Sequence, residues 1–229
     1  VAASMVLKVA KHGNRAVSSK AGAADLIEAA GIPLDLSPAS SAKLLERTGF
    51  CFLFAQKYHP AMRYVAPVRG ALKNPTIFNL ICPLVNPAPL SYQVLGVGKP
   101  ELLDVVAKAL ASLGLKHALV VHGSGTDEFA VHGPTEIREI TQEGIASFTV
   151  TPEELGITPA PLSELVGGDA EENLRLISEI FAGKGAPAQR EAIAATRCDA
   201  LSGGQGGIFE PGNRIGAVSA FQRRRRRPP

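Results

Sequence analysis

Apolar and polar positions follow two different patterns along the chain, and these patterns predict strands separated by helices. Short apolar runs are typical of buried strands, whereas apolar residues every three or four positions indicate amphipathic helices. The clearest helix covers 100–113, where Leu102, Leu103, Val106 and Leu110 share one face. Predicted strands cover 7–10, 50–55, 93–97, 116–121, 136–140 and 145–150, and other helices cover 1–7, 23–30, 37–48, 59–72, 76–80 and 169–181, with one more opening at 151–154.

Local signals place several helix ends. Gly31 follows one apolar period and is a good helix stop. Ser37 and Pro38 are a cap and a first helical residue, and Asp169 is a second cap. Because strands and helices alternate throughout, we expect an α/β fold with a mixed central sheet flanked by helices.

The periodic pattern stops at about residue 194. We therefore expect residues 1–194 to form one α/β domain, with a helical insert at about 56–90. Residues 195–229 have no helical or strand period, contain a Gly-Gln-Gly-Gly stretch and end in five arginines and two prolines. This composition predicts a disordered tail. Two origins fit it: a change of reading frame, or a basic tail for an acidic partner.

Composition excludes several functional classes. Apolar residues make up 45% of the 229 positions and charged residues 20%, as in ordinary globular proteins. The formal charge of +3 becomes −2 when the run Arg223–Arg227 is left out, and aromatics are only 5%, so we expect no nucleic-acid binding. No apolar stretch approaches the roughly 18 residues of a membrane span. Cys51, Cys82 and Cys198 fit no metal cluster and indicate a reducing, cytoplasmic setting.

A basic, glycine-containing segment follows the first predicted strand, and we interpret Lys11–Gly22 as a loop. Lys11 and Arg15 supply positive charge, and Gly13 lets the backbone approach a ligand closely. Ser18 and Ser19 precede a helix, where anions are favoured. The residues alone fit a phosphate- or carboxylate-binding loop and an ordinary basic connection equally well.

Two further segments carry candidate chemistry. Asp127 and Glu128 follow a buried strand and a glycine-rich turn, so both carboxylates can face one cation, although the residues alone favour a solvated acidic loop. Arg63 and Arg69 are six residues apart and point to different sides of a helix. An inward arginine beside His59 suits a planar carboxylate, although two surface arginines are the simpler alternative.

Together these segments identify a resemblance to anthranilate phosphoribosyltransferase that covers well over half the chain. Any one of them alone is weak, but their number and order are specific. The segments that resemble the family, in its order, are Lys11–Lys20, Phe52–Ala55, His59–Arg69, Thr76–Leu80, Pro83–Pro87, Gln93–Val97, His122-Gly123 and Asp127-Glu128.

The resemblance implies transfer of the phosphoribosyl group of phosphoribosyl pyrophosphate to the amine of anthranilate, releasing pyrophosphate, in tryptophan biosynthesis and with Mg²⁺. Asp127 and Glu128 would bind the metal, and no residue is assigned as acid or base. Phosphoribosyl pyrophosphate would contact Lys11, His12, Gly13, Asn14, Arg15, Ala16, Val17, Ser18, Ser19 and Ala23. Anthranilate would contact Asn14, Arg69, His12, Tyr58, His59 and Pro83, with its carboxylate on Arg69.

The sequence also departs from the family. Position 23 is Ala where many members have Ser, and Cys82 stands where a Gly usually precedes the Pro-Leu segment. The family's Gly-Thr-Gly-Gly-Asp loop and Asn-x-Ser-Thr segment are not in the chain, which begins at Val1 in a helix-like stretch. We therefore expect most of the small N-terminal helical domain, with the family's homodimer contact, to be missing, and the chain alone to be inactive.

Two alternatives to this function remain on the same fold. One is a pyrimidine nucleoside phosphorylase-like enzyme, although its Lys-Met-Ser-Gly-like loop is absent from the sequence. The other is a nucleic-acid-binding paralogue. Asn14 and Arg69 together favour an aminobenzoate substrate over both.

Overall fold

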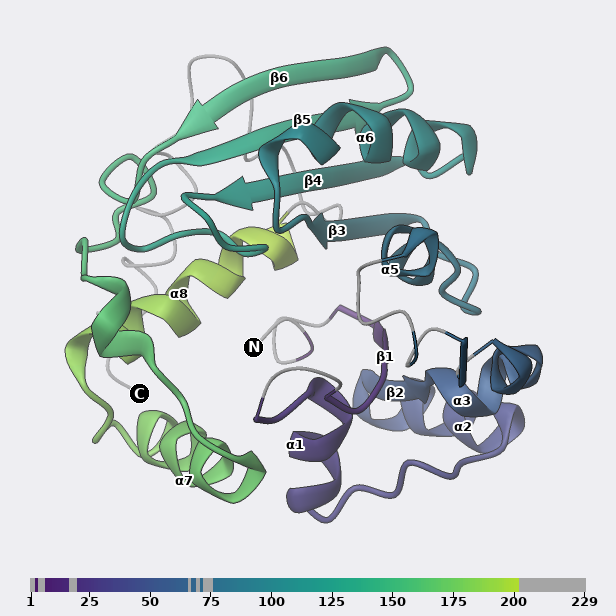
Figure 1. The fold of residues 1–229 in the computed structure, drawn as a ribbon. Helices are drawn as coiled ribbons and strands as arrows, with labels where there is room; N and C mark the ends of the chain where they lie inside the picture. Colours follow the sequence, from purple (N-terminus) through teal and green to yellow (C-terminus); the bar gives the residue numbers. More distant parts are fainter. Residues whose placement is uncertain are drawn as a thin grey trace. The chain divides into compact units, whose positions relative to one another are not determined.

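A computed structural model describes residues 3, 7–16, 20–65, 67, 68, 71 and 76–201 (Figure 1). The chain divides into two compact units. The first unit comprises 2–89 and 167–185, and the second comprises 90–166 and 186–229 with Val1. This division is finer than the single domain expected to residue 194.

The first unit is built on a pair of parallel strands. Strand β1 (Val9–Gly13) pairs with β2 (Phe50–Phe54), so that Gly13 lies opposite Phe54. Two helices, α1 (Ala23–Ala29) and α2 (Pro38–Thr48), connect the strands. The fully buried Ala24 of α1 packs with Leu34 and Phe52 in a small core. Helix α7 (Ala170–Phe181) contacts α1.

The predicted caps are present in this unit. The Ser37 side chain accepts a hydrogen bond of 3.1 Å from the Ser40 N–H and begins α2. Asp169 does the same for α7, accepting from the Glu172 N–H at 2.9 Å. Gly49 ends α2 with a φ of 76°, a left-handed conformation that glycine adopts without strain.

Short helical elements fill the stretch between β2 and the second unit. They are α3 (Ala55–Tyr58), the 3₁₀ helix η2 (Pro60–Tyr64), α5 (Ile77–Ile81) and the 3₁₀ helix η3 (Cys82–Leu84). The helix predicted over 59–72 is confirmed only in part: its first part, 60–64, is a 3₁₀ helix, whereas the described residues 67, 68 and 71 are α-helical. Pro60 opens a tight 3₁₀ turn that ends at Val65, and residues 66, 69, 70 and 72 lie outside the described ones.

The second unit contains a four-stranded mixed sheet in the order β3-β4-β5-β6. Strands β3 (Tyr92–Gly96) and β4 (His117–Gly123) are parallel, joined by the 3₁₀ helix η4 (Pro100–Leu102) and by α6 (Leu103–Ser112). Strands β5 (Thr135–Thr141) and β6 (Gly144–Val150) continue the sheet antiparallel. The predicted α/β class with a mixed, helix-flanked sheet is thus confirmed.

Both faces of β4 are buried. Helix α6 lies along the sheet (Figure 1) and presents Leu103, Val106 and Leu110, each at most 3% exposed, in the pattern the sequence predicts. A second cluster, around Leu119, Val121 and Ile137, packs against the β4–β5 loop and helix α8 (Pro187–Leu201). The 3₁₀ helix η5 (Leu162–Leu165) contacts α8.

Two sequence-based expectations differ from the structure here. Residues 151–154 open only a turn, because Gly156 adopts a φ of 69° while Leu155 and Ile157 enter the core. Helix α8 continues to Leu201, so the expected boundary at about 195 falls inside a helix, and 202–229 lie outside the described residues. None of the described helices is long and apolar enough to span a membrane.

Candidate functional site

The basic segment begins inside a strand, not in a loop as the sequence suggested. Lys11, His12 and Gly13 are the last residues of β1 and pair with β2. Gly13 lies so close to Phe52 that a Cβ there would come within 3.0 Å of the ring. The connection proper therefore starts at Asn14, and the strand pairing fixes the backbone before it.

Two histidines meet at the end of the strand pair. The Nε2 atoms of His12 and His59 are 3.2 Å apart, and the rings are perpendicular, with centroids 5.0 Å apart. Burial lowers the pKa of His12, the neighbouring His59 lowers it further, and a hydrogen bond to the Cys82 backbone partly opposes both. His12 is therefore mainly neutral at pH 7 and is engaged on both sides.

The other anthranilate candidates in the first unit are placed as follows. The Asn14 Oδ1 atom accepts from the Arg15 N–H at 2.9 Å and from Gln56 Nε2 at 3.4 Å. The Tyr58 hydroxyl donates to Ser41 of α2 at 3.0 Å, so it is turned toward that helix. Pro83 lies in η3. Arg69, with Val17, Ser18 and Ser19, lies outside the described residues.

Arg15 is held by carboxylates of its own unit. Its guanidinium bonds both carboxylate oxygens of Glu28, one at 3.0 Å, and lies 3.5 Å from Asp25 and 5.6 Å from the Phe54 ring centroid. The hydrogen bonds to Glu28 raise the pKa of Arg15 and lower that of Glu28. The Arg15 guanidinium therefore binds carboxylates of α1.

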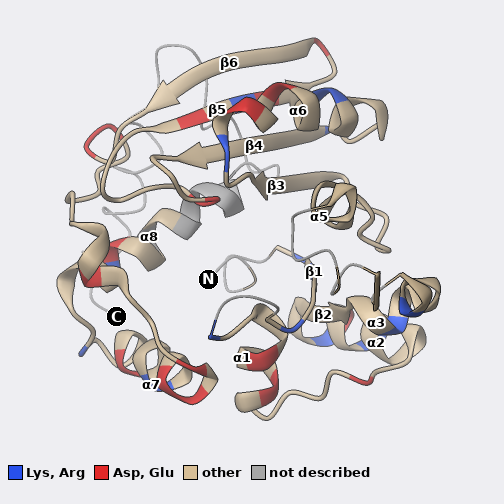
Figure 2. Ribbon diagram, in the orientation of Figure 1, with Lys and Arg blue, Asp and Glu red and all other residues tan. Residues whose placement is uncertain are grey.

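Asp25 pins the two ends of the connection between β1 and α1. Its Oδ2 atom accepts from the Ala16 N–H at 2.9 Å and from the Gly22 N–H at 2.8 Å. These bonds, with Arg15 behind them, lower the pKa of Asp25. Gly22 is required, since a Cβ there would lie 2.5 Å from the Ala16 nitrogen. Figure 2 shows the acidic residues gathered on α1.

The role of Asp25 in holding this connection was not predicted from the sequence. An Asp at the third position of a helix after a glycine is a signal for capping, so it could have been found. The candidate Ala23 is the first residue of α1, and its methyl group lies near Gly13.

The acidic pair belongs to the second unit. Asp127 and Glu128 are exposed and lie in the loop that connects β4 to β5. Their backbones are packed tightly: a Cβ on Gly96 would fall 1.6 Å from the Asp127 carbonyl oxygen, and one on Gly123 would fall 2.3 Å from that of Glu128. Within the described part of the chain, no three His, Cys, Asp or Glu side chains form a metal cluster.

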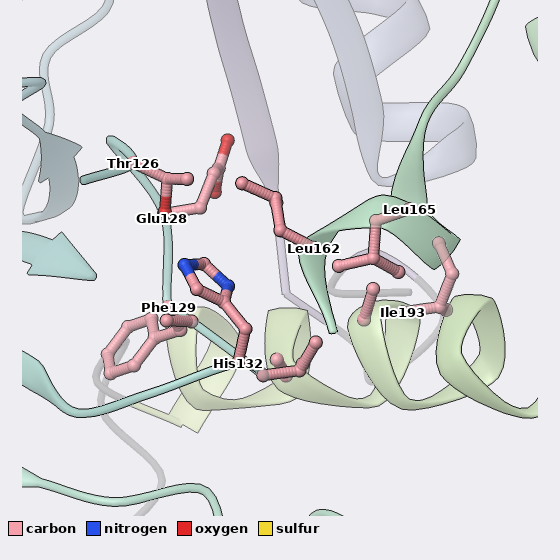
Figure 3. A pocket seen from close by; sticks show the side chains of 11 residues that line it. Thr126, Glu128, Phe129, His132, Leu162, Leu165 and Ile193 are labelled. Carbon is pink, nitrogen blue, oxygen red and sulfur yellow. The ribbon is translucent and has the colours of Figure 1, made fainter. Parts of the chain in front are cut away.

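A cavity of about 300 Å³ lies beside this loop. Figure 3 shows Thr126, Glu128 and His132 on one side of it and Leu165 and Ile193 on the other. The His132 Nε2 atom lies 3.0 Å from the Ser124 carbonyl oxygen, so the imidazole helps to close the loop on itself. The acidic pair thus stands on a well-supported loop with an apolar cavity next to it.

Known proteins share this fold and much of this sequence. Residues 1–205 match the family described as the glycosyl transferase family, a/b domain, and the chain belongs to this family. The chain is 50% identical over 195 residues to the anthranilate phosphoribosyltransferase of Aeromonas salmonicida, and 52% identical over 196 residues to that of Corynebacterium diphtheriae. These alignments cover 85% and 86% of the chain.

Solved structures agree in fold. The anthranilate phosphoribosyltransferase of Thermus thermophilus superposes with a TM-score of 0.82 at 43% identity, covering 96% of this chain and 65% of that one. The Saccharomyces cerevisiae enzyme in complex with PRPP and Mg gives a TM-score of 0.77 at 27% identity, covering 96% and 66%. The chain spans 58% of the length of the Aeromonas and Corynebacterium relatives.

Proposed function

We propose that the chain is the larger part of an anthranilate phosphoribosyltransferase, which transfers the phosphoribosyl group of phosphoribosyl pyrophosphate to anthranilate in tryptophan biosynthesis. The identity of about half of all positions with relatives of that name carries this proposal. The match to the family's a/b domain covers residues 1–205, a range that includes the basic segment, the His59–Arg69 stretch and the acidic pair. The Saccharomyces complexes with PRPP and Mg and with 4-fluoroanthranilate support the same substrate classes.

The first unit would supply the anthranilate side of the reaction. Arg69 suits the substrate carboxylate, because a guanidinium binds it through two parallel hydrogen bonds. His12 and His59 would pack beside the aromatic ring and orient it, with Asn14 at the edge of the same strand pair. Holding the amine near the sugar carbon C1 lowers the barrier by positioning alone. The amine of anthranilate already carries a lone pair, so no general base is assigned.

Lys11 and the backbone of the β1–α1 connection would bind the phosphate groups. Breaking the bond between C1 and pyrophosphate leaves negative charge on the leaving group, and fixed positive charge there stabilises the transition state. Lys11 is exposed in the middle of β1 and serves this role better than Arg15, whose guanidinium is engaged by Glu28 and Asp25. Of the basic segment we therefore assign the phosphate contact first to Lys11.

Mg²⁺ would be held by Asp127 and Glu128. Magnesium in phosphate enzymes typically takes one or two carboxylates and completes its shell with water and substrate oxygens. Two adjacent, exposed carboxylates on a firmly packed loop fit that donor set. When bound, the ion would neutralise charge that builds up on the pyrophosphate. We further propose cytoplasmic location and a homodimer for the whole enzyme.

These 229 residues alone are proposed to have little or no activity, because the Gly-Thr-Gly-Gly-Asp loop of the family is not among them. The test compares the chain with a chimera that carries the preceding segment of the Aeromonas salmonicida relative. Loss of anthranilate fluorescence is followed with phosphoribosyl pyrophosphate and Mg²⁺. We expect turnover by the chimera only. A folded chimera that ignores anthranilate but cleaves thymidine with phosphate would contradict the proposed function, and rapid turnover by the chain alone would contradict its incompleteness.

A further inference from the structure

His122, the residue before the last of β4, is buried with both ring nitrogens in use. It is 6% exposed. Its Nδ1 atom lies 2.8 Å from the Val97 carbonyl oxygen, and its Nε2 atom lies 3.2 Å from the Gly125 backbone nitrogen. A carbonyl only accepts and a backbone N–H only donates, so the proton must sit on Nδ1 and Nε2 must accept. The surroundings therefore select one neutral tautomer.

The two bonds tie the end of β3 to the start of the β4–β5 loop. Val97 directly follows β3, and Gly125 lies in the turn that Gly123 and Thr126 close through two backbone hydrogen bonds of 2.9 Å. Ser124 adopts a φ of 46° in this turn, a conformation that non-glycine residues rarely take. Such a conformation persists only where the surrounding structure holds it, and the His122 ring is part of that structure.

The turn determines where the acidic pair is presented. The backbone after Thr126 returns across the ends of β3 and β4, with the Asp127 carbonyl on Gly96 and that of Glu128 on Gly123. These carbonyls occupy the space that a Cβ atom would take on either glycine, so the backbone of the loop packs directly on the two strands. The backbone that carries Asp127 and Glu128 is consequently held in place.

We propose that His122, in its neutral Nδ1–H tautomer, is a positioning residue that holds Asp127 and Glu128 in the spacing a divalent cation requires. This inference rests on the proposed function, which assigns the pair to Mg²⁺. It adds a residue that binds neither metal nor substrate and acts only through the backbone of the loop. Residues that orient metal ligands affect affinity by about 10-fold to 100-fold, so the effect is measurable without turnover.

The experiment measures Mn²⁺ binding by the whole 229-residue chain, using the electron paramagnetic resonance signal of the free ion. His122→Asn keeps a donor near Nδ1 for Val97 and loses the acceptor for Gly125, whereas His122→Gln places an acceptor near Nε2. His117→Asn is the control, because His117 lies in the same strand and contacts Glu139 at 2.7 Å. Asp127→Asn with Glu128→Gln removes the carboxylates. Long-range ¹H–¹⁵N spectra of the unsubstituted chain report the tautomer directly.

We expect the proton on Nδ1, Mn²⁺ binding weakened about 10-fold by His122→Asn and less by His122→Gln, and a change below about 2-fold for His117→Asn. A proton on Nε2, or a folded His122→Asn chain that binds Mn²⁺ as the unsubstituted one does, would overturn the positioning role. If His122→Asn does not fold, the positioning role is tested by the tautomer of the unsubstituted chain and by Mn²⁺ binding to His122→Gln. Mn²⁺ binding that survives loss of both carboxylates, or no binding at all, would instead overturn the metal assignment on which the role rests.

Discussion

Two loops of this protein carry opposite charges and are held in different ways. The connection between β1 and α1 is basic in sequence and is pinned by a carboxylate: Asp25 bonds the backbone at both ends, and Arg15 lies behind it. The connection between β4 and β5 is acidic and is held by glycine contacts and the neutral His122. One loop uses charge for its own structure, and the other leaves its charge exposed.

Charge that holds a loop together can thus be told apart from charge that lies on exposed residues. Arg15 stands in the middle of a basic motif, yet its guanidinium is already engaged within the unit. Asp127 and Glu128 stand in a loop with few other charges, and their residues are exposed. Charge alone would predict a ligand-binding role for Arg15 as well as for Asp127 and Glu128. The hydrogen bonds of Arg15 show that its charge takes part in the structure of its own loop.

The largest effect is expected where the acidic loop touches a strand. Gly96→Ala places a Cβ 1.6 Å from the Asp127 carbonyl oxygen, so the loop must move away from β3. Such overpacking costs about 1–3 kcal/mol, measured by urea unfolding. Gly98→Ala is the matched control, because nothing lies within 4 Å of a Cβ there. Equal stability of the two variants would show that glycine packing does not hold this loop.

The next effect concerns the basic loop. Asp25→Ala leaves the N–H groups of Ala16 and Gly22 without their shared acceptor, so we expect both amides to exchange with solvent about 10-fold faster in NMR. Glu28→Gln removes the strongest partner of Arg15 but touches neither amide, and should change exchange by less than about 2-fold. If the two variants behaved alike, the Arg15 pair, and not the Asp25 bonds, would be holding the loop.

Low pH should remove the stabilising effect of Asp25 on the basic loop. The pKa of Asp25 is lowered in the folded chain, so its stabilising effect is complete above the ordinary value of 3.8 and is lost as the pH falls through the lowered pKa. The difference in thermal midpoint between the unsubstituted chain and Asp25→Asn should therefore shrink below about pH 4. A difference that is constant from pH 7 to pH 3 would mean that the ionised carboxylate contributes nothing.

The smallest effect is expected at the histidine pair. His59→Phe preserves a ring but removes a neighbouring charge, so the pKa of His12 should rise while staying below 6.5, because burial is the larger cause. NMR titration of the His12 ring measures this shift. His132→Phe in the second unit is the control and should leave the His12 titration unchanged. A fall in the pKa of His12 on removing His59 would refute the coupling.

Much of the fold could be predicted because local signals and packing agree. Ser37 and Asp169 cap the helices that they were predicted to cap, and the apolar face of α6 is the one that the periodicity predicts. The turn at 151–156 was not predicted, because Thr151 and Glu154 imitate the start of a helix while Gly156 ends it after one turn. Helix α8 was missed because its hydrophobic period is weak.

The site was predictable in its residue types but not in its partners. Spacing alone cannot show that Arg15 turns toward Glu28, thirteen positions later, or that His12 meets His59, 47 positions later. Such contacts depend on strand pairing. The role of His122 depends on the partners of both of its ring nitrogens. One partner, Val97, is 25 positions away in the sequence, so no local pattern predicts it.

An anthranilate site in the first unit can be tested by a fluorescence titration of anthranilate against the 229-residue chain. We expect saturable binding that Arg69→Ala weakens at least about 10-fold, because a charge-assisted, bidentate bond is lost, and that Arg63→Ala leaves nearly unchanged. Arg63 is the matched control, since its guanidinium packs over the Tyr64 ring at 4.7 Å. A folded chain that does not bind anthranilate, or binds it equally well without Arg69, would contradict the proposed site.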